Sequence, residues 1–107
     1  MEKADFSAWV RNVWQVVQGI PRGCVLTYGD VARLAGGAGS ARRVSQAMRR
    51  APRGMKLPWH RVINARGEIS IRSRAGAARQ QQALLESEGI VFTAEGRVDL
   101  ARFRWRP

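Results

Sequence analysis

Cysteine and histidine are scarce in this sequence, so few side chains are available for covalent catalysis or metal binding. The chain of 107 residues has one cysteine, Cys24, and one histidine, His60. A lone cysteine forms no internal disulfide, which favours a cytoplasmic protein. A reactive cysteine needs neighbours that stabilise its thiolate. Cys24 has no histidine close to it in the sequence, so a structural role is favoured. We predict no bound metal and no cofactor.

Long apolar runs are missing too. No apolar stretch approaches the roughly 20 residues that span a bilayer, and residues 1–5 do not open a signal peptide. A length of 107 residues is typical of one domain. We therefore expect a single domain over residues 1–107 and no membrane partner.

Acidic residues are the third shortage. Eight Asp and Glu stand against 19 Lys and Arg, which gives a formal charge of +11, and no acid occurs between Asp30 and Glu68. The basic residues in that window are Arg33, Arg42, Arg43, Arg49, Arg50, Arg53, Lys56, Arg61 and Arg66. An arginine-rich field of one sign is typical of a protein that binds a phosphate backbone. An anionic membrane or an acidic protein is the weaker alternative.

Three helices are predicted in the first half of the chain. The first buries residues at helical spacing and is capped by Asp5 or Ser7. Its apolar positions are Phe6, Trp9, Val10, Val13, Val17 and Ile20. A short, apolar and buried link, residues 24–26, leads to the second helix, which Thr27 caps with help from Asp30. The apolar side of the second helix is Val31, Ala32, Leu34 and Ala35.

The third helix, residues 41–50, begins after a glycine-rich turn and is capped by Ser40. Only a narrow stripe is apolar, at Val44, Ala47 and Met48. Two short helices, the second loaded with Arg, Ser and Gln, are typical of a helix-turn-helix whose second helix enters a DNA groove. The residues of this helix and its cap that are expected to contact DNA are Ser40, Ala41, Arg42, Arg43, Ser45, Gln46 and Arg49.

The second half is predicted to hold two small hairpins and a helix. Residues 61–63 and 68–71 would pair as the wing, and residues 90–92 and 97–100 as the second hairpin. Residues 75–88 are expected to be helical, with Ala78, Gln81, Leu84 and Leu85 inward. The basic and aromatic tail, residues 102–107, packs on the domain or touches DNA. The fold class is thus mainly α with small β-hairpins, a winged helix-turn-helix DNA-binding domain.

Trp59 and His60 follow Pro58 at the entry to the predicted wing. A loop held by a rigid scaffold is a common place for function, and a large ring beside an imidazole suits a pocket for a planar ligand. The alternative is a packed tryptophan beside a hydrogen-bonded histidine. These residues alone leave both open.

Three segments together resemble a known family. They are Thr27-Tyr28-Gly29-Asp30-Val31-Ala32, then Ala41-Arg42-Arg43-Val44 with Ala47-Met48-Arg49, then Pro58-Trp59-His60-Arg61-Val62-Ile63. In this order they are similar to the DNA-binding domain of the O6-alkylguanine-DNA alkyltransferases. In that family a proline-cysteine-histidine-arginine stretch carries the cysteine that accepts the alkyl group, and Trp59 stands in its place here. That is the mark of the alkyltransferase-like proteins, which bind the lesion without transferring its alkyl group.

The resemblance implies a role for each matching residue. Tyr28 would help to rotate the nucleotide out of the duplex, and Arg42 would fill the gap in the stack. Trp59, with Tyr28, Arg72 and His60, would form the alkylguanine pocket, and Arg72 would lie over the flipped base. No residue would be catalytic. The partners would be duplex DNA containing O6-alkylguanine and proteins of nucleotide excision repair, and the protein would be a monomer.

The resemblance also implies two departures from the enzymes. His60 and Glu88 match the pair that activates the enzyme's cysteine, and we expect them to remain as structural hydrogen-bond partners. Ala51 stands where the enzymes have a hinge asparagine before a proline. The alternatives are a winged-helix transcription regulator and a divergent methyltransferase that uses Cys24.

Overall fold

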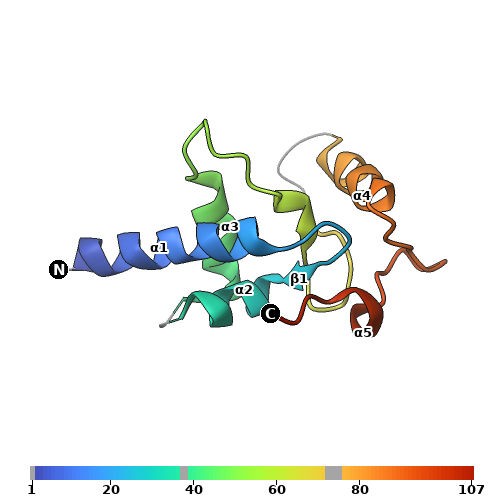
Figure 1. Ribbon diagram of the computed structural model, residues 1–107, viewed down its shortest axis with the longest axis horizontal. Helices are drawn as coiled ribbons and strands as arrows, with labels where there is room; N and C mark the ends of the chain where they lie inside the picture. Colours follow the sequence, from blue (N-terminus) through green and yellow to red (C-terminus); the bar gives the residue numbers. More distant parts are fainter. Residues whose placement is uncertain (1, 37–38, 72–75) are drawn as a thin grey trace.

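The computed structural model describes residues 2–36, 39–71 and 76–107. Its helices are α1 (Glu2–Gly19), α2 (Tyr28–Ala35), α3 (Ala41–Arg49), the 3-10 turn η1 (Trp59–Arg61), α4 (Ala77–Ser87) and α5 (Leu100–Phe103). Two short strands, β1 (Leu26–Thr27) and β2 (Val62–Ile63), complete the elements. Helices α1, α2 and α3 form one end of the molecule, and α4 and α5 lie at the other (Figure 1). The predicted mainly helical class is confirmed.

Helix α1 supplies much of the first core. Its periodic residues Trp9, Val10, Val13, Val17 and Ile20 are buried as predicted. The expected cap at residue 5 or 7 is wrong, because α1 already begins at Glu2 and both positions lie inside it. No described helix combines the length and apolarity needed to cross a membrane.

The start of α2 confirms the predicted capping box. Thr27 Oγ1 accepts a hydrogen bond from the Asp30 backbone N–H, and Asp30 Oδ2 accepts one from the Thr27 N–H, both at 3.0 Å. The prediction that Leu34 is buried is wrong, since its side chain is 42% exposed. Val31 and Ala35 lie one helical turn apart and define the buried stripe, and Leu34 falls at its solvent edge.

The predicted wing pairing is wrong. β2 pairs in parallel with β1, with Leu26 opposite Val62 and Thr27 opposite Ile63, and no strand is formed over residues 68–71. Only a turn remains there, in which the Asn64 N–H donates to the Glu68 carbonyl (3.0 Å). Both residues of β2 are completely buried, so they fit between two packed layers and not in an exposed ribbon.

The predicted fourth helix and second hairpin are both present, but each is shorter than expected. Helix α4 begins at Ala77, and its buried stripe is Ala77, Gln81 and Leu85. Ala78 is therefore exposed, against prediction, because the stripe repeats every four residues from Ala77. The second hairpin shrinks to a single antiparallel bridge between Phe92 and Val98.

The C-terminal tail packs on the domain. The Val25 N–H donates to the Phe103 carbonyl, and the Trp105 N–H donates to the Val25 carbonyl, each at 2.9 Å. The Arg104 guanidinium lies 3.1 Å from the Asp30 carboxylate at the start of α2. The tail thus runs beside β1 and is anchored next to the helix that carries Tyr28.

Candidate nucleic-acid interface

Helix α3 turns an apolar stripe inward and a basic face outward. Ser40 caps it, with Oγ accepting from the Arg43 N–H at 3.4 Å. Val44 and Ala47 are buried against α1 and α2, and Met48 is half-buried. The exposed polar side chains on its other faces are Arg42, Arg43, Gln46 and Arg49. This is the arrangement expected of a helix that enters a DNA groove.

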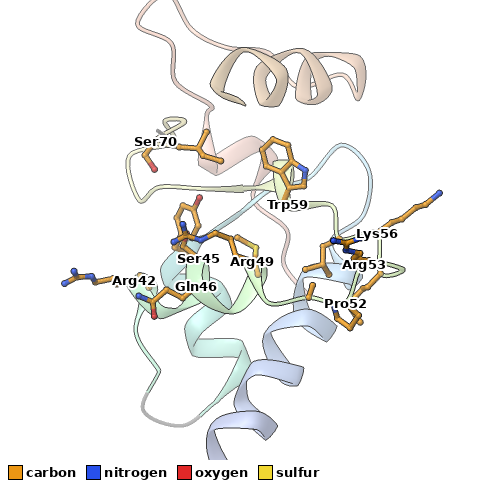
Figure 2. A pocket seen from close by; sticks show the side chains of 16 residues that line it. Arg42, Ser45, Gln46, Arg49, Pro52, Arg53, Lys56, Trp59 and Ser70 are labelled. Atoms are coloured by element: carbon orange, nitrogen blue, oxygen red, sulfur yellow. The ribbon is translucent and has the colours of Figure 1, made fainter. Parts of the chain in front are cut away.

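Beside α3 lies a wide cleft of about 1100 Å³. Its walls are Tyr28 of α2, α3, the segment 51–57, η1 and residues 70–71, and none of the described lining residues is acidic (Figure 2). The lining consists of Tyr28, Ala41, Arg42, Ser45, Gln46, Met48, Arg49, Ala51, Pro52, Arg53, Met55, Lys56, Leu57, Trp59, Ser70 and Ile71. This open cleft is larger than most small-molecule pockets, which are about 300–1,000 Å³, so it has room for one nucleobase.

The cleft brings together most of the predicted site residues. Those that line it are Tyr28, Ala41, Arg42, Ser45, Gln46, Arg49 and Trp59. Ser40, which caps α3, and the exposed Arg43 are not in its lining. His60 is also directed elsewhere, and Arg72 lies outside the described residues.

Tyr28 occupies the first turn of α2 and reaches the cleft as a half-buried side chain. Burial raises the pKa of its phenol above the ordinary value of 10.0, while the Arg49 charge and a Ser70 hydrogen bond act in the opposite direction. The phenol is therefore neutral at pH 7 and can donate a hydrogen bond.

Trp59 belongs to η1, which Pro58 precedes. Its indole is half-buried and stands across the cleft from Ser45 and Gln46 of α3 (Figure 2). The His60 ring meets it edge to face, with ring centres 6.2 Å apart and planes at 86°. A flat apolar surface thus faces a basic helix, which suits a planar base stacked or packed against the indole.

Behind η1, Glu88 gathers the polar groups of the turn. Its carboxylate accepts hydrogen bonds from His60 Nε2 (2.8 Å), Arg61 Nη2 (2.7 Å) and the Gly23 N–H (3.3 Å). Burial would raise the pKa of Glu88, but the Arg61 and His60 hydrogen bonds outweigh it and lower that pKa to about 2. His60 and Glu88 are therefore hydrogen-bond partners as expected.

Arg61 is also committed to this cluster. Its Nε and Nη2 both reach the Glu88 carboxylate, and its Nη1 donates to the Ile20 carbonyl at 2.9 Å. Its place in the acid-free window suggested a contribution to phosphate binding. The structure instead uses its charge to balance Glu88, since only 16% of its side chain is exposed.

Cys24 does not belong to the cleft lining. It is half-buried, where a fully buried link was expected, and packs against the core of α1, α2 and α3. Within the described ranges, no three His, Cys, Asp or Glu side chains are placed to hold a metal ion.

Sequence reasoning missed one wall of the cleft. Pro52, Arg53, Met55 and Lys56 lie between the end of α3 and η1 and line the cleft together (Figure 2). The acid-free window already contained both Arg53 and Lys56, so charge was the available signal. Ser70, which the predicted wing placed in a strand, also reaches the cleft.

The family model for the DNA-binding domain of 6-O-methylguanine DNA methyltransferase matches residues 8–90. Among curated proteins, the DNA base-flipping protein of Escherichia coli K12 is 49% identical over 105 residues, covering 98% of this chain and 78% of its own. Alkyltransferase-like protein 1 of Schizosaccharomyces pombe is 39% identical over 100 residues, covering 90% of this chain and 93% of its own.

A solved structure agrees with these matches. The crystal structure of S. pombe Atl1 in complex with damaged DNA containing O6-carboxymethylguanine superposes with a TM-score of 0.78 at 38% identity. It covers 94% of this chain and 97% of the Atl1 chain. The chain therefore belongs to the family of the 6-O-methylguanine DNA methyltransferase DNA-binding domain, among its alkyltransferase-like members.

Proposed function

We propose that this protein senses O6-alkylguanine in duplex DNA and does not transfer the alkyl group. The observation that carries the proposal is that Trp59 lines the basic cleft. By the resemblance, Trp59 stands where the related enzymes carry their acceptor cysteine. An indole has no nucleophilic atom comparable to a thiolate. The naming of the E. coli relative as a base-flipping protein and the complex of Atl1 with damaged DNA support this function.

The proposed binding mode places the N-terminal end of α3 in a groove of the duplex. Arg42 is exposed at that end and also borders the cleft, so its guanidinium can enter the stack as the damaged nucleotide leaves it. Tyr28 crowds the phosphate, and the extruded base enters between α3 and Trp59. Extrusion costs a few kcal/mol in lost stacking and pairing, which contacts inside the cleft must offset.

The cellular role that we propose follows from the absence of transfer. A protein that holds a lesion without repairing it must hand it on, and nucleotide excision repair acts on flagged lesions of many shapes. We propose that a monomer binds the damaged duplex and recruits excision-repair proteins. A second function through Cys24 gains no support, since Cys24 does not border the cleft.

Incubation with a duplex containing O6-methylguanine is expected to leave both partners chemically unchanged. Intact-protein mass spectrometry should show no added methyl group, and digestion of the DNA should recover all of the lesion. An active alkyltransferase serves as the positive control on the same duplex. A gain of one methyl group on the protein, mapped to Cys24 or to any other residue, would contradict the proposal.

A further inference from the structure

Two side chains, one from α4 and one from its C-terminal cap, contact η1 without lining the cleft. Glu88, just after the helix, holds the side chains of His60 and Arg61, while Gln81 holds the backbone of the same segment. Gln81 and Glu88 are seven residues apart, which places both on one face of the helix. The turn that carries Trp59 is thus braced by α4 through both its side chains and its main chain.

The Gln81 amide makes two hydrogen bonds to the backbone at the end of η1. Its Nε2 donates to the His60 carbonyl and to the Val62 carbonyl, each at 3.0 Å. Both protons of the NH₂ group are therefore used, and the side chain is only 2% exposed. The two carbonyls flank the end of η1, where a helical turn leaves acceptors without partners. A buried carbonyl that loses its donor is costly, so loss of the amide would favour movement of this backbone toward water.

We infer that Gln81 is a positioning residue for lesion recognition, which acts by fixing the turn that presents Trp59 to the cleft. The inference rests on the proposed function. Gln81 itself is absent from the cleft lining, so it would act through Trp59 and not by touching the base.

The packing of the molecule separates this role from general DNA binding. Helix α4 packs against η1, whereas the basic helix α3 packs against α1 and α2. A change at Gln81 should therefore displace the Trp59 wall while leaving the arginines of α3 in place. The change should lower the preference for alkylated guanine. It should leave the phosphate contacts unchanged, because they do not depend on the base.

The test compares Gln81→Met with Gln82→Met. Methionine matches glutamine in length but donates no hydrogen bond, and Gln82 is an exposed neighbour whose amide donates to Glu86 (3.3 Å). Fluorescence titrations would measure the affinity ratio for one duplex with O6-methylguanine or guanine, at several salt concentrations. We expect Gln81→Met to lower this ratio about three- to tenfold, the usual effect of one or two lost hydrogen bonds. The salt slope should not change, and Gln82→Met should match the parent.

If Gln81→Met does not fold, as judged by circular dichroism, Gln81→Asn takes its place, because its shorter arm withdraws the amide from both carbonyls. A folded variant that keeps the full ratio overturns the inference. Equal weakening on both duplexes also overturns it, since that result marks a purely structural residue. Failure of the proposed function is distinguishable, because the parent itself would then show no preference.

Discussion

Glu88→Gln is expected to lower the free energy of unfolding at pH 7 by about 3–5 kcal/mol, the usual effect of breaking a buried ion pair by removing one partner. Glu88 has 5% of its side chain exposed and Arg61 has 16%, so neither charge is well solvated. The neutral amide would leave the Arg61 guanidinium partly buried without a counter-charge. Chemical denaturation of parent and variant measures the difference.

The pH dependence gives this prediction a second readout. The folded-state pKa of Glu88 is about 2 against an ordinary 4.5, so the charged carboxylate stabilises the fold above pH 4.5. That contribution is lost as the pH falls from 4.5 toward 2. The difference in the free energy of unfolding between the parent and Glu88→Gln should therefore decrease over that pH range. Glu86→Gln, on the exposed side of α4, is the control and should stay within about 0.5 kcal/mol of the parent. A gap that does not depend on pH would contradict the assigned ion pair.

Trp59→Ala is expected to reduce the preference for O6-methylguanine by about 1–3 kcal/mol, the usual contribution of an aromatic side chain stacked on a base. Trp59 carries no charge and belongs to the cleft, so binding of the unmodified duplex should change little. The dependence of affinity on salt should also be unchanged, because no phosphate contact is removed.

Arg49→Ala provides the opposite case for the same titrations. Arg49 is an exposed cation on α3 that lines the cleft. Its loss should reduce the salt slope by about 1 and weaken the binding of both duplexes alike.

The outcome that would contradict the role of Trp59 is a Trp59→Ala variant that folds normally and keeps its full preference for the lesion. Trp59 would then serve packing alone.

The parts of the fold that depend on neighbouring residues were predictable. The Thr27 and Asp30 capping box is set by a spacing of three residues, and the buried face of α1 by helical periodicity. The partner of Val62–Ile63 was not, because the choice between a nearby segment and Leu26–Thr27 depends on which layers bury the strand. Composition showed that this strand is apolar, but only packing shows that it is buried on both faces.

The site divides in the same way. The resemblance placed Tyr28, Arg42 and Trp59, and the structure gathers them around one cleft. Charge counting treated Arg61 as one more cation for DNA, although it balances Glu88 behind η1. The sequence does not show which group a charged side chain will contact, because the partner can come from a distant segment of the chain. The same limit hid the hydrogen-bond partners of Gln81, which the sequence placed only on the inward face of its helix.

Direct titration of the unaltered protein tests the central claim. One duplex would be prepared twice, with guanine or with O6-methylguanine at the same position, and both dissociation constants measured at the same salt concentration. We predict that the lesion duplex binds at least about tenfold more tightly, because the flipped base adds contacts in the Trp59 cleft to the phosphate contacts shared by both duplexes. Equal dissociation constants would contradict the account and leave a basic helix-turn-helix protein that does not distinguish the lesion.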